Sequence, residues 1–248
     1  MPKSACPVVA PGKLFAALKL SQNQCENLGI EPGTEPIGCG LFGCAYPKAG
    51  DKSRVIKVTR DSEDVAAVLK ADKTGLIPKV FALQKLKLKD APKPSPKKIR
   101  EYQAARTAKG RPTKDFTSFL MREKKPAVFV LEVERVKPLT KEQKTFIAVN
   151  DYVDALKLPR AKFIKSSDKI CKIEFTGQKV KKCKDFAKRI YTVKKGLLDV
   201  GVPWTDAHPN NWGITKDGRL VALDIGLTSL PLKKKLKVLA GLGMFSDH

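Results

Sequence analysis

Short apolar runs separated by Gly, Pro and charged residues dominate the first half of the chain. The runs at 54–58, 78–83 and 128–136 are rich in Val, Ile, Leu and Phe and have the length of β-strands. Between the first two, residues 61–73 carry apolar positions at helical spacing, and Gly75 follows them. The pattern therefore predicts several strands with one helix among them.

Helical spacing is found on both sides of this region. Residues 13–28 predict a helix that ends at Gly29, and Thr140 with Gln143 forms the pattern of a capping box at the start of another. A further helix is expected at 183–200, where apolar residues recur at spacings of 4, 3 and 4, namely Phe186, Ile190, Val193 and Leu197. The elements together predict an α+β fold.

The segment 37–46 satisfies the pattern G-x-G-x-x-G with three glycines, Gly38, Gly40 and Gly43. In a dinucleotide-binding fold a helix begins at these glycines. Here Pro47 and Gly50 follow instead, and the next regular element is the strand at 54–58. The order therefore predicts a glycine-flanked hairpin and disfavours a dinucleotide-binding arrangement.

Lys57 lies between Ile56 and Val58 in the strand that follows the glycine segment. A glycine-rich hairpin lets backbone amides approach phosphates, and a lysine on the next strand can bind the α- and β-phosphates of a nucleotide. The alternative is that Lys57 is an ordinary edge-strand lysine. Glu63 is the first candidate to pair with Lys57 and Asp64 is the second, although either could instead complement the helix N-terminus.

Candidate catalytic residues are densest at 202–212. This segment contains Asp206 and Asn211, and a predicted hairpin at 213–223 leads from it to Asp224. Phosphoryl transfer needs a carboxylate that orients the attacking hydroxyl, and Asn and Asp oxygens that hold Mg²⁺ between the phosphates. Asp206 is the candidate for the first role, and Asn211 with Asp224 for the second.

The order of these motifs resembles a protein-kinase-like fold over about residues 35–226, with insertions. The loop Asp-x-His-x-x-Asn is similar to that of aminoglycoside and choline phosphotransferases. The compressed layout also resembles small serine/threonine kinases encoded by phages and large DNA viruses. The resemblance implies a bilobal fold, with an N-lobe at 1–136 that includes a basic insertion at about 84–125, and a minimal helical C-lobe at 137–248.

The resemblance also implies a role for each motif residue. Asp206 would be the catalytic base, Asn211 and Asp224 would bind Mg²⁺, and His208 would contact the γ-phosphate of ATP. The alternative for His208 is a loop histidine hydrogen-bonded to backbone. The implied nucleotide-binding groups are the backbone around Gly38, Gly40 and Gly43, the Lys57 and Glu63 side chains, and the backbone from Glu134 to Val136 beside adenine.

Three departures from the kinase pattern stand out. Trp204 lies two residues before Asp206, where kinases usually have His, so the contact that orients the Asp-x-Gly segment must differ. Ile225 replaces the usual Phe. After Asp224 only 248 − 224 = 24 residues follow, which predicts a truncated C-lobe with one basic helix at about 232–240 and no standard substrate platform.

The net charge points to an anionic partner. The chain has 49 Lys+Arg against 25 Asp+Glu, a formal charge of +24. The segment 84–125 has 14 basic and 4 acidic residues, and 156–195 has 14 basic and 3 acidic residues. Such density favours an acidic protein substrate or another polyanion, although a solvated surface is the plainer alternative. Aromatic residues are only 7% of the chain, so any nucleic acid is expected to bind non-specifically through its phosphates.

Cysteine usage and hydropathy predict a cytoplasmic protein, in the host cytoplasm or the virion if virus-encoded. No apolar run reaches the roughly 18 residues of a membrane span, and no signal-peptide pattern is present. The six cysteines include no Cys-x-x-Cys pair, and the chain has only two histidines, so zinc sites of the usual spacing and a disulfide framework are both disfavoured. We expect reduced thiols, with Cys39 and Cys44 beside the glycine segment as candidates for oxidation.

Three hypotheses follow for function. The first is a minimal Mg²⁺- and ATP-dependent serine/threonine protein kinase that acts on acidic proteins. The second is a small-molecule phosphotransferase, favoured by His208 and disfavoured by the short C-terminal part. The third is a basic, kinase-shaped protein that binds nucleic acid or forms part of a virion, without catalysis. The joint presence of Lys57, Asp206, Asn211 and Asp224 favours an enzyme.

Overall fold

The computed structural model describes residues 22–31, 33–39, 43–59, 61–87, 97, 100, 104, 127–151, 158–204 and 207–225. By their contacts these residues form two compact units. The first unit takes the described residues up to Ser62 and those from Val80 to Arg135, and the second takes Glu63–Lys79 and the described residues from Val136 onward. The units interleave along the chain, and the lobes expected at 1–136 and 137–248 remain a prediction.

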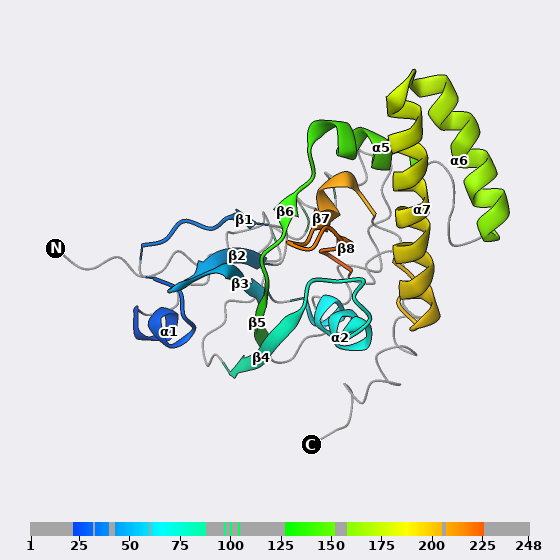
Figure 1. Ribbon diagram of the computed structural model, residues 1–248. Helices are drawn as coiled ribbons and strands as arrows, with labels where there is room; N and C mark the ends of the chain where they lie inside the picture. The colour runs from blue at the N-terminus through cyan, green and yellow to red at the C-terminus, as the bar shows by residue number, and fades with distance from the viewer. Residues whose placement is uncertain are drawn as a thin grey trace. The chain divides into compact units, whose positions relative to one another are not determined.

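An antiparallel five-stranded sheet with the order β1-β2-β3-β5-β4 forms the first unit (Figure 1). The strands are β1 (Gly38–Cys39), β2 (Gly43–Lys48), β3 (Asp51–Thr59), β4 (Val80–Lys87) and β5 (Ala127–Glu134). Strands β2 and β3 form the predicted hairpin, with Ala45 opposite Lys57 and Lys48 opposite Asp51. Because Gly43 begins a strand and not a helix, the dinucleotide-binding arrangement is excluded.

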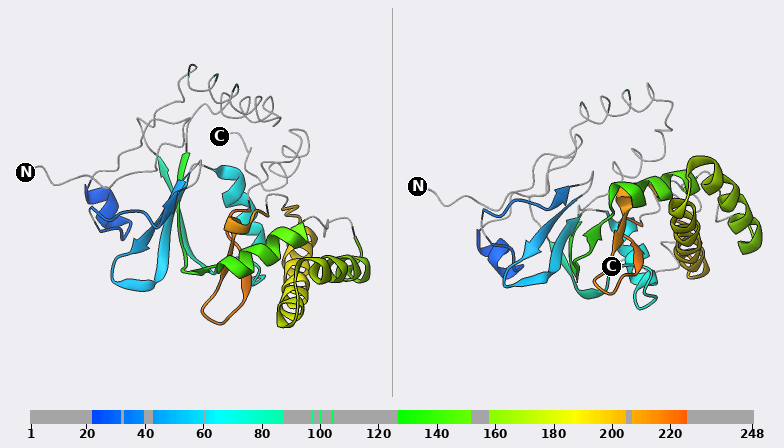
Figure 2. Two further views of the ribbon diagram at one scale, coloured as in Figure 1. Left: turned by 90° about the horizontal axis from the view of Figure 1, so that it is seen from above. Right: turned by 45° about the horizontal axis from the view of Figure 1, so that its top comes forward.

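Helix α1 (Gln22–Asn27) lies beside the sheet of the first unit (Figures 1 and 2). The apolar core of this unit combines residues of α1 and of the segment after it with alternate residues of the strands. The members of this core are Cys25, Ile30, Cys44, Tyr46, Ile56, Val58, Val128 and Val130. Helix α1 ends as predicted before Gly29, which has a φ of 70° that favours glycine. Since successive side chains of a strand point to opposite faces, Lys57 lies on the face of β3 away from this core.

Helices dominate the second unit. They are α2 (Ser62–Ala71), of which all but the first residue belongs here, α5 (Lys141–Asp151), α6 (Arg160–Glu174) and α7 (Gln178–Asp199). The capping box predicted for α5 is present: Thr140 N donates to Gln143 Oε1 at 2.9 Å, and Gln143 N donates to Thr140 Oγ1 at 3.2 Å. The predicted apolar stripe of α7 is buried, and the helix starts five residues before the expected position 183.

Helix α6 is not predicted by the sequence pattern. Its buried positions are Phe163, Ser167 and Cys171. Because the buried face includes a serine and a cysteine, it is not clearly more apolar than the rest of the helix in the sequence. Helices α6 and α7 lie side by side as an antiparallel pair in both views (Figures 1 and 2). The aromatic rings of Phe163 and Tyr191 meet between them, with centroids 5.2 Å apart.

A small three-stranded antiparallel sheet completes the second unit. Its strands are β6 (Lys137–Pro138), β7 (Trp212–Ile214) and β8 (Leu220–Ala222), in the order β6-β7-β8. Strands β7 and β8 are the hairpin predicted around Asp217-Gly218, whereas β6 is too short and polar to be predicted. Gly213 allows β7 to pack closely, because a Cβ at this position would lie 2.5 Å from Val136 Cγ2.

The structure corrects one boundary and leaves other expectations untested. Residues 84–87 belong to β4, so this strand extends four residues into the segment assigned to the basic insertion. Most of the insertion, residues 13–21 of the predicted first helix, the helix expected at 232–240 and the end of the C-lobe lie outside the described residues. Over the part of the chain that is described, no helix is long and apolar enough to cross a membrane.

Candidate active site

Two tryptophans fix the segment around position 206 in the second unit. Trp204 and Trp212 are 0% and 1% exposed, and their ring centroids lie 4.6 Å apart. Trp204 Nε1 donates to the carbonyl oxygen of Asp224 at 2.7 Å, and Trp212 Nε1 donates to the carbonyl oxygen of Ala207 at 2.9 Å. The departure at position 204 therefore keeps an orienting contact to the Asp224 segment, with an indole as the donor.

Asp206 itself lies outside the described residues. Its neighbours Trp204 and Ala207 are described, and both are buried. Its role as the base therefore stays a prediction from the sequence.

His208 begins the short 3₁₀-helix η1 (Pro209–Asn211). Its Nδ1 accepts a hydrogen bond from Asn210 N at 3.3 Å, and its carbonyl oxygen accepts from Asn211 N at 2.7 Å. The imidazole is exposed. The side chain thus caps the turn through Nδ1, as in the backbone-bonded alternative, and its contact with a γ-phosphate stays a prediction.

Asn211 and Asp224 are brought together by the β7–β8 hairpin. Trp212 pairs with Ala222 across the hairpin, and Leu223 N donates to the carbonyl oxygen of Asn211 at 2.9 Å. Asn211 therefore lies one position before the paired end of β7, and Asp224 lies two positions after the paired end of β8. Asn211 is half-buried and Asp224 is exposed. Their amide and carboxylate oxygens are the ligand types that suit Mg²⁺, which usually takes one or two protein ligands beside phosphates and water.

Within the described residues, no three His, Cys, Asp or Glu side chains gather as a metal site.

Helix α2 contributes a buried carboxylate to the Asp224 segment. Asp64 is 1% exposed, and its Oδ1 accepts a hydrogen bond from Ile225 N at 3.1 Å. Glu63 is 3% exposed. Asp64, the second candidate partner of Lys57, therefore holds the Asp-x-Gly segment within the second unit. The pairing of Lys57 with Glu63 joins residues of the two units and remains a prediction.

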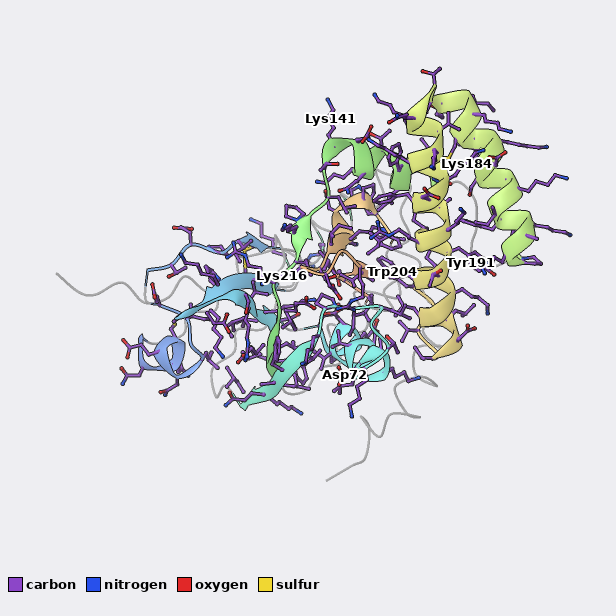
Figure 3. All side chains as sticks on the ribbon, viewed as in Figure 1. Asp72, Lys141, Lys184, Tyr191, Trp204 and Lys216 are labelled. Carbon is purple, nitrogen blue, oxygen red and sulfur yellow. A yellow bond between two sulfur atoms is a disulfide. The ribbon has the colours of Figure 1, made fainter. Side chains whose placement is uncertain are left out.

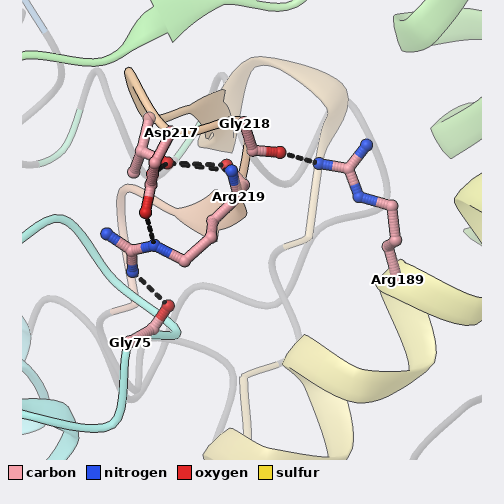
Figure 4. Close-up of polar contacts among 6 residues, drawn as sticks. Gly75, Arg189, Asp217, Gly218 and Arg219 are labelled. Atoms are coloured by element: carbon pink, nitrogen blue, oxygen red, sulfur yellow. Dashed lines mark hydrogen bonds and ion pairs between the residues drawn. The ribbon is translucent and has the colours of Figure 1, made fainter.

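The turn between β7 and β8 is anchored by two arginines (Figure 4). Arg219 donates from Nε to Asp217 Oδ2 at 2.7 Å and from an Nη atom to the carbonyl oxygen of Gly75 at 2.9 Å. Arg189 of α7 donates to the carbonyl oxygen of Gly218 at 2.7 Å. These contacts hold the hairpin that carries Asn211 and Asp224 at its far end.

The carboxyl of Asp217 is strongly stabilised as its anion. A hydrogen bond from Thr215 Oγ1, followed by one from Arg219, lowers the pKa of Asp217 from 3.8 to about 2. Its contribution to folding is therefore fully present above about pH 4 and is lost as the pH falls toward 2.

The Asp217→Asn variant tests this contribution. We expect it to have a lower melting temperature than wild type at pH 7. The difference should shrink as the pH falls from about 4 toward 2, because Asp217 is progressively protonated as the pH approaches its pKa of about 2 and so loses its advantage over the uncharged Asn. Thermal unfolding across this pH range measures the effect, with Asp185→Asn on the exposed face of α7 as the charge-matched control. A difference that persists unchanged at pH 2 would contradict the assignment.

Residues of the first unit expected to bind nucleotide lie on its sheet. Lys57 is half-buried and is flanked across the sheet by Ala45 on β2 and Leu131 on β5. Glu134 ends β5, and the backbone N–H of Arg135 donates to the carbonyl oxygen of Ser53 at 2.8 Å. Val136 belongs to the second unit, where its side chain packs on β7.

The glycines of the predicted phosphate loop differ in what the fold requires of them. A Cβ on Gly43 would lie 2.2 Å from the carbonyl oxygen of Val58, so glycine is needed here for the close packing of β2 on β3. Gly38 is exposed and has no atom within 4 Å of such a Cβ. Gly40 lies outside the described residues. Strand packing alone therefore explains Gly43, and the role of Gly38 and Gly40 beside phosphates stays a prediction.

The expectation of reduced thiols is wrong for the structure. Cys39 and Cys44 form a disulfide across the β1–β2 pair, with Cα atoms 4.1 Å apart, and Cys171 and Cys183 form one between α6 and α7, with Cα atoms 5.9 Å apart. Cys25 is disulfide-bonded as well. Cys39 and Cys44 are the two residues that the sequence marked as candidates for oxidation, whereas the pairing of Cys171 with Cys183 depends on helix packing and was not indicated. The first disulfide spans the segment that contains Gly40.

Sequence reasoning missed the groups that hold the site together. The Asp64–Ile225 hydrogen bond and the two arginine anchors link residues far apart in the chain, and no local pattern marks them. The absence of the usual histidine at position 204 was the one available signal, since it required a substitute contact. No known protein-family model matches the chain, and no curated protein sequence matches it significantly.

Proposed function

We propose that the protein is an ATP-dependent phosphotransferase with a protein-kinase-like, bilobal arrangement, and that it transfers the γ-phosphate to serine or threonine hydroxyls of proteins. The observation that carries the proposal is the network in the second unit. Trp204 Nε1 binds the Asp224 carbonyl, and Leu223 N binds the Asn211 carbonyl. These contacts join the Asp-x-x-x-x-Asn segment to the Asp-x-Gly segment, as transfer from a metal-bound nucleotide requires.

Asn211 and Asp224 would hold Mg²⁺ through an amide oxygen and a carboxylate oxygen. When bound, the ion would neutralise charge on the phosphates of ATP. Trp204 and Asp64 bind the two polar groups of the peptide unit that follows Asp224, its carbonyl oxygen and Ile225 N. A peptide group fixed at both of these atoms holds the backbone from which the Asp224 side chain extends, which favours a positioned site.

In the proposed reaction the substrate hydroxyl attacks the γ-phosphorus. A new O–P bond forms, the bond to the β,γ-bridging oxygen breaks, and ADP leaves with that oxygen. Asp206 would orient the hydroxyl and accept its proton. His208 would contact the γ-phosphate.

On the first unit, Lys57 would pair with the α- and β-phosphates. The backbone at Gly38, Gly40 and Gly43 would cover them, and backbone groups of Glu134 and Val136 would bind adenine. Glu63 would orient Lys57. The charge of +24 favours acidic proteins as substrates.

Transfer of labelled γ-phosphate from Mg·ATP tests the proposal. Wild type is compared with Asp206→Asn and with the control Asp185→Asn, which makes the same charge change on the exposed face of α7. The acceptors are the protein itself, an acidic protein, a basic protein and small alcohols. We expect label on a protein hydroxyl with wild type and with the control, and a loss on the order of 10³-fold or more with Asp206→Asn.

Each other outcome would change the proposed function or the role proposed for Asp206. Label on the alcohols alone would indicate a small-molecule kinase. Equal transfer by Asp206→Asn would remove Asp206 from the mechanism. Failure of wild type to bind ATP in the presence of Mg²⁺ would overturn the phosphotransferase assignment and favour a binding protein.

A further inference from the structure

Helix α6 has two chemically distinct faces. Its buried positions Phe163, Ser167 and Cys171 are four residues apart and pack inward. The opposite face carries the lysine stripe, which we define as Lys162, Lys165, Lys169 and Lys172, at spacings of 3, 4 and 3 residues. All four lysines are exposed. At 1.5 Å per residue the stripe is about 15 Å long.

The α6 helix forms the outside of the pair with α7. Long side chains with nitrogen at their tips extend from it on the side away from α7 (Figure 3). The stripe therefore faces solvent within its unit.

The positive charge of the lysine stripe is largely uncompensated. Among the residues that the structure describes, Lys162, Lys165 and Lys169 make no ion pair. Lys172 pairs with Asp168 at 2.9 Å, and this carboxylate is shared with Lys184 of α7. Hydrogen bonds from Lys184 and then Lys172 lower the pKa of Asp168, so its single negative charge is already used.

The neighbouring helix matches several of its lysines with carboxylates. On α7, Lys188 pairs with Asp185 at 3.1 Å, Lys195 with Asp199 at 2.6 Å, and Lys182 with Glu142 of α5 at 3.7 Å. Lys179 and Lys181, at the start of α7, are exposed and make no ion pair among the described residues. What distinguishes α6 is that its unmatched lysines lie on one face, opposite the buried positions.

We propose that the lysine stripe binds the phosphate backbone of nucleic acid without sequence preference. Lysines act as point charges on phosphates, and the stripe has no arginine fork for bidentate recognition of a base or a carboxylate. A duplex carries one phosphate charge per about 1.7 Å of its axis with both strands counted, so a length of about 15 Å holds about nine phosphates, more than four lysines can contact.

An acidic peptide fits this surface less well than a phosphate backbone. Peptide recognition usually relies on apolar anchors seated in a pocket or on pairing at a sheet edge. The stripe lies on a helix and not at a sheet edge. The apolar residue next to it, Ile173, is 79% exposed, so it projects into solvent and does not line a pocket for an apolar anchor. The proposal needs none of the residues assigned to phosphotransfer, so it stands or falls independently of the proposed function.

The test compares two variants of the full chain with equal net charge. The stripe variant carries Lys162→Gln, Lys165→Gln and Lys169→Gln. The control carries Lys182→Gln, Lys188→Gln and Lys195→Gln, three lysines already matched with carboxylates. Fluorescence anisotropy measures binding to a labelled 20-base-pair duplex of mixed sequence between 50 and 200 mM salt, and thermal unfolding checks that each variant is folded.

We expect the slope of log affinity against log salt to fall by about 2.7 in the stripe variant, since each lost phosphate contact removes about 0.9. Raising the salt fourfold would then weaken wild-type binding by a factor about 40 times larger than the factor by which it weakens binding of the stripe variant. The slope of the control variant should differ from that of wild type by less than about 0.9, the value of one phosphate contact. Asp206→Asn should bind the duplex like wild type, which separates this result from any loss of transfer.

Three results would overturn the proposal. Equal slopes for the two variants would show that only net charge matters. A stripe variant with the wild-type slope would place duplex binding elsewhere on the chain. Binding of labelled polyglutamate that depends on the stripe, together with duplex binding that does not, would assign the stripe to an acidic protein.

Discussion

Replacing Asp224 by Ala is expected to abolish phosphotransfer while leaving the fold intact. The Asp224 side chain is exposed, and the group that Trp204 binds is its carbonyl oxygen, which the variant keeps. The substitution therefore removes the proposed cation ligand and little packing. Loss of a metal contact worth several kcal/mol corresponds to a drop of about 10³-fold in transfer.

Labelled transfer and Mg²⁺-dependent binding of ATP measure this effect, and the melting temperature reports the fold. Asp185→Ala on α7 removes an exposed carboxylate of the same unit and should transfer phosphate like wild type. Transfer by Asp224→Ala within a factor of a few of wild type would refute the cation site. An unfolded variant would show instead that the carboxylate is structural, which the exposure of the side chain argues against.

Replacing Trp204 is expected to give the largest loss of stability. The side chain is 0% exposed and packs against Trp212, with the two rings tilted by 56° to each other. Trp204→Ala should lower the free energy of unfolding by about 3–5 kcal/mol, because it leaves a cavity. Trp204→Phe keeps most of the volume and loses the N–H, so the Asp224 carbonyl is left without this donor, at a cost of about 1–3 kcal/mol.

Trp204→His separates positioning from packing. Histidine restores a ring N–H at this position but fills less space. If Trp204 positions the Asp224 segment, the His variant should transfer phosphate faster than the Phe variant, although it is no more stable. Chemical denaturation gives the stabilities, and kcat measured at saturating ATP gives the effect on transfer. Equal kcat values for the two variants would mean that Trp204 only fills the core.

The strands and helices with a clear local pattern could be predicted from the sequence. The glycine hairpin, the lysine strand, the capping box at Thr140 and the β7–β8 hairpin are all present. Helix α6 was missed because its inward stripe includes Ser167 and Cys171. Cys39 and Cys44 were candidates for oxidation, and they form a disulfide, whereas the Cys171–Cys183 disulfide was missed because it depends on how α6 and α7 pack.

The candidate site was predictable in its residue types and not in its supporting contacts. Spacing alone marked Asn211 and Asp224, because both flank a hairpin with a clear turn. The bond from Ile225 N to Asp64 joins residues 161 positions apart, and nothing local encodes it. For Trp204, the sequence predicted only that the orienting contact to the Asp-x-Gly segment must differ from the usual histidine contact, and it did not predict the indole hydrogen bond.

The interleaving of the two units has a consequence for biosynthesis. Helix α2 and the loop after it belong with the second unit, where Asp64 binds Ile225 N and the Leu76 carbonyl accepts from Ala222 N. At about 5–20 residues per second, the ribosome reaches Ile225 some 8–32 s after Asp64. Until then α2 must persist without its final partners. A fragment beginning at Val136 would lack them permanently, so the second unit cannot be isolated by one cut after β5.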